Sequence, residues 1–102
     1  MKIHIAPTAF KDIDVASDWW RRNRLAAPRL FEEELRDALG RLADMPFTGQ
    51  RTREEEETFV DVWRFYLSAT RYFLYYRVDE RADVVQVLRL WHASRGSMPK
   101  LP

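Results

Sequence analysis

The clearest hydrophobic pattern lies in the last third of the chain, where a short charged stretch separates two apolar runs. In the first run, the alternate residues that fall on one face of an extended segment are Tyr72, Leu74, Tyr76 and Val78. After Asp79–Asp83 the pattern resumes in Val84–Trp91, where three of the first four residues are β-branched. This pattern predicts a β-hairpin with a five-residue loop. Because both strands are apolar on both faces, we expect them at the centre of a sheet that helices cover on at least one side.

The N-terminal segment predicts a strand followed by a helix. Lys2–Ala6 alternates polar and apolar residues, and Pro7 ends that pattern. Thr8 stands where the N-cap of a helix would lie. The apolar residues that follow at three- and four-residue spacing are Phe10, Ile13, Ala16 and Trp20. Trp19 either widens this apolar stripe or is exposed, and the sequence leaves both readings open.

A second helix is predicted before the middle of the chain. Pro28 suits its first turn, and Met45–Pro46 ends it. Its apolar stripe consists of Phe31, Leu35, Ala38, Leu39 and Leu42. Joined by the polar linker Asn23–Ala27, the two helices should form an antiparallel hairpin whose shared apolar side needs a sheet to pack on.

The remaining segments complete an α+β architecture. We expect Pro46–Thr58, which contains the acidic stretch Glu54–Glu57, to be a surface loop and Phe59–Leu67 to be a strand. Ser68–Arg71 would turn this strand into the next, and Gly96–Pro102 should be irregular. The prediction is a single domain over residues 1–102, in which an N-terminal strand and an antiparallel two-helix hairpin pack on a mainly antiparallel four-stranded sheet. The position of the first strand in this sheet stays open.

Composition narrows the classes of function. Seventeen basic and sixteen acidic residues give a formal net charge of +1, which argues against a broad basic surface for duplex nucleic acid. The chain has no cysteine, and its two histidines, His4 and His92, are far apart in sequence. We therefore expect no disulfide, no metal site and no other cofactor. No segment has the pattern of a signal peptide or of a membrane span, so we expect a cytoplasmic protein without membrane contacts.

Two segments carry a resemblance to a known family. The runs YFLYYRVDE (Tyr72–Glu80) and VLRLWHASR (Val87–Arg95), together with the order of elements, resemble the RelE/ParE superfamily of toxins from bacterial type II toxin–antitoxin systems. The helix end at Leu42–Pro46, the glycine-containing turn after it and the proline-containing tail fit the same resemblance. The resemblance implies a cytoplasmic toxin that a small cognate antitoxin neutralises. RelE-like members cleave messenger RNA on the ribosome, whereas ParE-like members inhibit DNA gyrase.

The chemistry of RNA cleavage helps to weigh these two activities. Attack by a 2′-hydroxyl needs a base, a group that stabilises the phosphorane charge and an acid for the leaving oxygen. The resemblance implies that RelE-like nucleases have an arginine at the position of Phe73, so this chain lacks that candidate phosphate contact. It also has no tyrosine or histidine after Arg95, near the end where such nucleases commonly have an aromatic residue or a histidine. His92 and Arg95 are the candidate catalytic residues, with His92 as general acid or base. The alternative is that His92 forms local hydrogen bonds at a strand end and Arg95 pairs with an acidic side chain.

Other candidate residues concern binding. The predicted contacts to a target or to the antitoxin are Arg21, Arg22, Arg24, Arg64, Arg77, Arg89 and Trp91. Each also has a simpler reading: a solvated turn for the first three, stacking or salt bridging within the sheet for the strand arginines, and a core position for the tryptophan.

The favoured prediction is a ParE-like toxin that binds DNA gyrase and is blocked by its antitoxin. The alternative is a ribosome-dependent endoribonuclease that cleaves mRNA with His92 and Arg95. A third class is an interaction domain with neither activity. A homodimer and a toxin–antitoxin hetero-oligomer are both compatible with the sequence.

Overall fold

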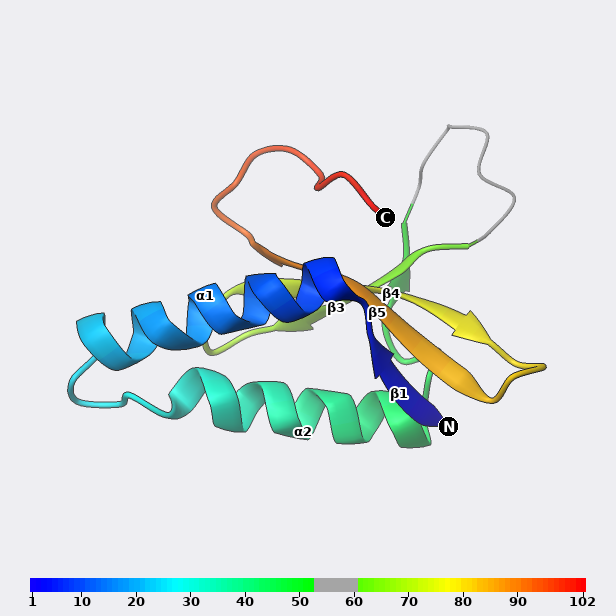
Figure 1. Ribbon diagram of the computed structural model, residues 1–102, viewed down its shortest axis with the longest axis horizontal. Helices are drawn as coiled ribbons and strands as arrows, with labels where there is room; N and C mark the ends of the chain where they lie inside the picture. The colour runs from blue at the N-terminus through cyan, green and yellow to red at the C-terminus, as the bar shows by residue number, and fades with distance from the viewer. Residues whose placement is uncertain (53–60) are drawn as a thin grey trace.

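A computed structural model describes residues 1–52 and 61–102. The elements, in order, are β1 (Lys2–Ile5), α1 (Pro7–Asn23), α2 (Leu30–Asp44), β2 (Gln50–Arg51), β3 (Trp63–Leu67), β4 (Tyr72–Asp79) and β5 (Val84–His92). Figure 1 shows α1 and α2 side by side and running in opposite directions, which confirms the predicted helical hairpin. The predicted acidic stretch Glu54–Glu57 and the predicted strand residues Phe59 and Val60 lie outside the described residues.

The described residues form a sheet in the order β1-β5-β4-β3-β2. β1 runs parallel to β5, and the other neighbouring strands are antiparallel. The predicted central position of β4 and β5 is confirmed. The prediction had four strands, and the additional strand is the short β2, which lies inside the expected loop. Gln50 of β2 pairs with Arg64 of β3. Asp79 pairs with Val84, so the hairpin loop is Glu80–Asp83, one residue shorter than predicted.

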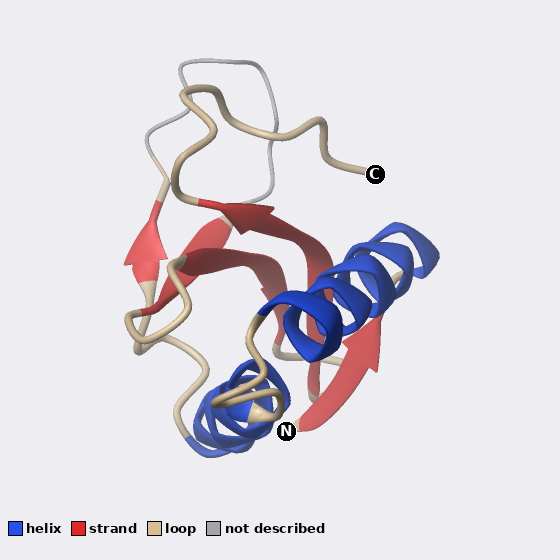
Figure 2. Cartoon of the chain, turned by 90° about the vertical axis from the view of Figure 1, so that its left-hand side faces the viewer, coloured by secondary structure: helices blue, strands red, loops and turns tan. Residues whose placement is uncertain are grey.

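The two helices and the C-terminal tail lie on opposite sides of the curved sheet, as Figure 2 shows. The main core, between helices and sheet, includes the fully buried side chains of Phe31, Leu42, Leu74, Tyr76 and Val87. A smaller core on the other side consists of Val62, Tyr75 and Leu88, with Phe73, Trp91, Met98 and Leu101 packed against it. The tail Gly96–Pro102 is irregular, as predicted, and it covers this smaller core.

A β-bulge in β5 changes which residues of that strand face each core. Tyr75 pairs with Arg89 and Tyr76 pairs with Val87, so Leu88 has no residue opposite it in β4. Leu88 belongs to the core under the tail and Leu90 to the core under the helices, although residues two apart in a regular strand share a face. The irregular alternation of apolar residues in this strand follows from that single extra residue.

The start of α1 differs from the prediction. The helix begins at Pro7, whose fixed φ suits the first helical position, and its N-cap is Ala6 without a side-chain cap. The N-cap prediction for Thr8 is wrong, because its hydroxyl lies within the helix and donates to the Leu88 carbonyl at 3.1 Å. Phe10, predicted in the apolar stripe, is 63% exposed, because the preceding alanine takes the core-facing position.

The start of α2 also differs. The helix begins at Leu30, and Pro28 lies in the turn before it, where the Leu30 amide donates to the Ala27 carbonyl at 3.2 Å. Its buried residues are Phe31, Leu35, Ala38 and Leu42, all within the predicted stripe. Trp19, which the sequence placed either in the apolar stripe of the first helix or at the surface, is exposed. Across the part of the chain that the structure describes, no helix combines the length and the apolar character that a membrane crossing requires.

Candidate functional site

Asp12 fixes α1 to the central strand β5. Its carboxylate accepts hydrogen bonds from Arg89 Nε at 2.7 Å, from Arg89 Nη2 at 3.1 Å and from the Leu90 amide at 3.1 Å. Both side chains of this ion pair are 20% exposed. Arg89 also donates to the Lys100 carbonyl at 3.0 Å, which ties the tail to the same strand. Arg89, predicted as a binding residue, is therefore engaged in holding α1, β5 and the tail together.

Glu34 of α2 fixes the turn between β3 and β4. Its carboxylate accepts from the Ala69 amide at 2.7 Å, the Thr70 amide at 3.0 Å and the Thr70 hydroxyl at 2.6 Å. Thr70 is buried, so the two bonds to its amide and hydroxyl satisfy polar groups of a residue with little access to water. The turn ends at Arg71, which has a left-handed backbone with φ of 66°. Glu34 thus determines where the Arg71 side chain leaves the fold.

A groove of about 1010 Å³ runs along α1 beside the ends of β4 and β5, and we call it the α1 groove. Its apolar and aromatic lining consists of Val15, Ala16, Trp19, Trp20, Tyr72 and Leu90. Its basic lining consists of Lys11, Arg24, Arg71, Arg89 and Arg95. Asp12 is the only carboxylate among the described residues that line it, and Arg89 already pairs with it. The groove therefore combines an apolar floor with an excess of positive charge.

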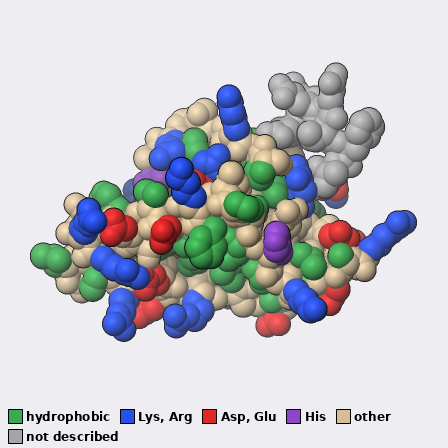
Figure 3. Space-filling model, viewed as in Figure 1, with side chains coloured by type: hydrophobic (Ala, Val, Ile, Leu, Met, Phe, Trp, Pro, Cys, Tyr) green, Lys and Arg blue, Asp and Glu red, His purple; other side chains and the backbone are tan. Residues whose placement is uncertain are grey.

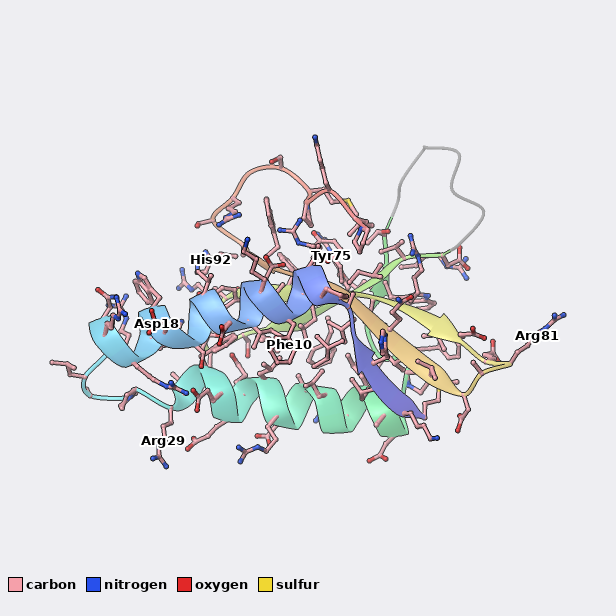
Figure 4. The ribbon with its side chains drawn as sticks, viewed as in Figure 1. Phe10, Asp18, Arg29, Tyr75, Arg81 and His92 are labelled. Carbon is pink, nitrogen blue, oxygen red and sulfur yellow. The ribbon has the colours of Figure 1, made fainter. Side chains whose placement is uncertain are left out.

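His92 lies at the end of β5 and lines the α1 groove, and Figure 4 shows it alongside α1 on the side away from α2. Its Nδ1 accepts from the Ser94 amide at 3.1 Å and lies 2.7 Å from the Ser94 hydroxyl oxygen. The ring packs edge-on against Tyr72, with centroids 4.9 Å apart. Because a ring nitrogen that accepts from an amide carries no proton, these contacts favour the tautomer protonated at Nε2. His92 thus forms local hydrogen bonds at the strand end.

Arg95 stacks on Trp91 instead of pairing with an acid. Its Cζ lies 4.2 Å from the Trp91 ring centroid, and Arg89 approaches the same ring at 5.3 Å. Among the described residues no carboxylate pairs with Arg95. The indole Nε1 of Trp91 donates to the Ser97 carbonyl at 2.7 Å. Trp91, predicted as a binding residue, therefore packs between the sheet and the tail.

A second groove, of about 870 Å³, lies on the tail side of the sheet, and we call it the sheet groove. Its basic and aromatic lining consists of Arg51, Arg64, Arg95, Phe73, Tyr75 and Trp91. Arg64 stacks over Phe73, with Cζ 4.5 Å from the ring centroid. The described lining residues include no carboxylate and no histidine. His92 and Arg64 therefore lie in different grooves, and Arg95 lines both.

The other predicted arginines contact neighbouring side chains or are partly buried. Three of them form pairs: Arg21 with Glu32, Arg22 with Asp18 at 3.2 Å, and Arg24 with the Trp19 ring at 5.0 Å. Hydrogen bonds from Ser17 and then from Arg21 lower the pKa of Glu32. Exposed ion pairs of this kind contribute only ~0–1 kcal/mol, so Arg21 and Arg22 can exchange them for other partners. Arg77, on β4, has a buried Nε without an acceptor among the described residues.

Three residues that shape these grooves were missed by reasoning from sequence. Asp12 and Glu34 look like ordinary polar-face acids in the sequence, so no signal marked them. Gly49 had a signal, a glycine in the predicted turn after the second helix. Its amide donates to the Tyr76 hydroxyl at 3.1 Å, and a Cβ there would collide with that hydroxyl and with the Arg64 carbonyl. Burial raises the pKa of Tyr76.

Metal-ligating side chains do not gather anywhere in the described ranges. Within residues 1–52 and 61–102, no group of three His, Asp or Glu side chains is placed to hold an ion. The described grooves are lined by cations, aromatic rings, apolar side chains and His92.

Comparison with solved structures identifies proteins of the same fold. A toxin–antitoxin complex, RelBE2 from Mycobacterium tuberculosis, matches with a TM-score of 0.58 at 22% identity, over 91% of this chain and 91% of that chain. The chromosomal ParDE system from P. aeruginosa matches with a TM-score of 0.59 at 18% identity, over 90% and 95%. The YoeB/ParE toxin from Agrobacterium tumefaciens matches with a TM-score of 0.56 at 18% identity, over 90% and 98%. At these identities the likeness shows the fold.

Sequence comparison identifies the family. No match was found among curated protein sequences. The family model for the ParE toxin of the type II toxin–antitoxin system parDE matches residues 3–96, which include both helices and nearly the whole sheet. The chain therefore belongs to the ParE toxin family of type II toxin–antitoxin systems.

Proposed function

We propose that this chain is a ParE-like toxin that acts in the cytoplasm, stops growth by binding DNA gyrase and is neutralised by a cognate antitoxin. The observation that carries the choice of binding over catalysis is the separation of His92 from Arg51 and Arg64, which line the sheet groove only, whereas Arg95 lines both grooves. Proton transfer to an RNA phosphate requires the acid or base within about 3 Å of the reacting oxygen. His92 faces the α1 groove, and its Nδ1 is already bonded to Ser94.

Relatives support the antitoxin as partner. The RelBE2 structure is a toxin–antitoxin complex, and the P. aeruginosa structure is a ParDE toxin–antitoxin system. We infer the same kind of partner for this chain, because its fold matches theirs over nine tenths of its length or more. Binding to an antitoxin and binding to gyrase both require exposed surface rather than acid–base chemistry, and the α1 groove supplies such a surface.

The test is a gyrase supercoiling assay with the purified protein, run beside mapping of RNA 5′ ends after brief induction. We expect inhibition of supercoiling at near-stoichiometric protein, no codon-linked cuts and full relief when the antitoxin is added. His92→Ala should weaken this inhibition only modestly, because a binding mechanism spread over a surface does not require proton transfer by the imidazole. Codon-linked cuts with normal supercoiling would contradict the proposal.

A second candidate, mRNA cleavage on the ribosome, is favoured by one observation. Arg51, Arg64 and Arg95 line the same groove without a described carboxylate, and guanidinium groups of this kind can hold phosphates. In that case His92→Ala and Arg95→Ala should each abolish the cuts, since both were predicted to act on the reacting phosphate. Arg36→Ala, on the outer side of α2, is the matched control and should leave cutting unchanged.

A further inference from the structure

We propose that the sheet groove binds the phosphate backbone of the DNA that gyrase holds. This inference rests on the gyrase target proposed above, and it adds nucleic acid as a direct contact of the chain. It is carried by two arginines that stack on neighbouring rings, by the absence of acidic side chains from the described lining, and by the position of the groove away from the helices.

Arg64 lies in the groove without an acidic partner among the described residues. It pairs with Gln50 on one side and with Tyr75 on the other, so the sheet fixes the direction of its side chain. The residue is half-buried, and its Cζ lies 4.5 Å from the centroid of the Phe73 ring. A guanidinium that has lost part of its water is costly without an anion, and a phosphate would supply that anion.

Arg95 stacks on the neighbouring ring. Phe73 and Trp91 are direct partners across β4 and β5, and the side chains of such a pair are neighbours on one face of the sheet. The Cζ of Arg95 lies 4.2 Å from the Trp91 ring centroid, and the bond from Trp91 Nε1 to the Ser97 carbonyl holds that ring in place. Stacking uses the flat face of a guanidinium and leaves its N–H donors, which lie in the plane, free to contact oxygen atoms. Arg64 and Arg95 therefore present two sets of donors to the same groove.

The chemistry of the lining favours a phosphate that is held and not cut. The α1 groove exposes Val15 by 65% and Trp19 by 43%, whereas guanidinium groups cover the Phe73 and Trp91 rings of the sheet groove. The sheet groove thus offers more charge and less apolar surface than the α1 groove, as suits a polyanion. Its described lining has no carboxylate and no histidine that could transfer a proton to or from a phosphate ester.

The small net charge decides how DNA reaches the groove. A protein that binds free duplex tightly contacts roughly 6–10 phosphates, and a chain with a net charge of +1 and two such arginines does not match this. Weak phosphate contacts become effective when another protein holds the DNA beside them, because the second contact is then intramolecular. Gyrase with bound DNA meets this condition, so the chain should bind that complex more tightly than it binds gyrase alone.

The position of the groove leaves the helices free for the gyrase protein. Gly96, Ser97 and Met98 of the tail line the groove, and Figure 2 shows the tail on the side of the sheet opposite to α1 and α2. Figure 3 shows basic side chains gathered around the tail. DNA on the tail side and gyrase on the helix side can therefore be contacted at the same time.

Binding of labelled toxin to gyrase with and without DNA provides the test. The chain contains no cysteine, and Figure 4 shows Arg81 at the far tip of the β4–β5 hairpin, so Arg81→Cys takes a fluorophore away from the groove. Anisotropy is measured with purified gyrase alone and with gyrase that holds a linear duplex of mixed sequence. We expect the DNA-bound enzyme to bind about a hundredfold more tightly, or roughly tenfold for each arginine. This gain should fall with log salt concentration with a slope of about −2, because two phosphate contacts release counterions.

Single substitutions assign the gain to the groove. Arg64→Gln and Arg95→Gln should each remove about tenfold of it and reduce the steepness of the salt dependence by about one. The matched control Arg36→Gln removes the same charge from the exposed side of α2 and should keep the whole gain. Thermal melts check that the half-buried position of Arg64 tolerates the change, and Arg95→Gln tests the same claim at an exposed position.

The outcomes separate this inference from the proposed function. Equal affinity of the wild type for gyrase with and without DNA would overturn the inference and leave the proposed function standing. A DNA-dependent gain that both arginine variants keep would overturn the assignment to the sheet groove. Wild-type protein that neither binds nor inhibits gyrase would overturn the proposed function and this inference with it. Codon-linked RNA cuts that are lost in Arg64→Gln would assign the groove to mRNA, and the inference would again be wrong.

Discussion

Asp12→Ala should destabilise the chain far more than the loss of one surface acid. The carboxylate accepts three hydrogen bonds, two from Arg89 and one from the Leu90 amide. Its loss leaves a guanidinium and an amide without their acceptor between α1 and β5. Hydrogen bonds to charged groups contribute ~1.5–3 kcal/mol, and water can replace part of this at a pair that is 20% exposed. We expect the free energy of unfolding to fall by about 2–3 kcal/mol and the Tm to fall by roughly 10–20 °C.

Asp18→Ala is the matched control for this experiment. Asp18 lies on the same helix, and its pair with Arg22 is exposed, with side chains 56% and 76% accessible. Such a helical pair contributes only ~0.3–0.5 kcal/mol. Urea unfolding followed by tryptophan fluorescence measures both variants, and a double-mutant cycle with Arg89→Ala isolates the pairwise energy. Equal stabilities of the two aspartate variants, or a coupling energy below about 0.5 kcal/mol, would refute the argument that Asp12 fixes α1 to the sheet.

Four further predictions concern single positions. Gly49→Ala should cost about 1–3 kcal/mol in urea unfolding, because the new Cβ collides with neighbouring backbone. Arg71→Gly should change stability by less than about 1 kcal/mol in urea unfolding, since relief of the left-handed strain offsets the added chain entropy. Because the pKa of Tyr76 is raised in the folded chain, its contribution to stability is fully present below pH 10.0 and is lost as the pH rises through the folded pKa. Tyr76→Phe should therefore reduce the decline of the free energy of unfolding at alkaline pH, measured by urea unfolding. Because the pKa of Glu32 is lowered in the folded chain, its contribution to stability is fully present above pH 4.5 and is lost as the pH falls through the folded pKa. The hydrogen bond from Ser17 is the main cause of this lowering, so Ser17→Ala should weaken the dependence of the Tm on acid pH.

The periodic part of the fold could be predicted from sequence because it depends on which faces are apolar. Alternation in the β4 run and helical spacing in the α2 stripe are local patterns, and both lead to the observed elements. The bulge at Leu88 could not be predicted, because a run that is apolar on both faces looks the same with or without one extra residue. The exposure of Phe10 was missed for a related reason: an adjacent alanine fits the core-facing position as well as a larger residue does.

The candidate site was harder to predict than the fold. Candidate arginines could be selected by type and strand position, but their neighbours depend on tertiary contacts. Arg89 is tied to a residue 77 positions away in sequence, and Arg95, just after β5, stacks on the Trp91 ring of that strand. The groove that a residue lines depends on the face of the sheet to which its side chain points. For this reason His92 and Arg64 line different grooves.

The parallel pairing of β1 with β5 has a consequence for biosynthesis. β1 and α1 are made first, yet the strand that holds both is the last element of the sheet to be synthesised. Contacts so distant along the chain form slowly, and the nascent N-terminal half has no sheet on which to bury its apolar side. A ribosome still translating this message therefore carries an unfinished chain that presents neither groove, and any binding through them can begin only after the final strand emerges.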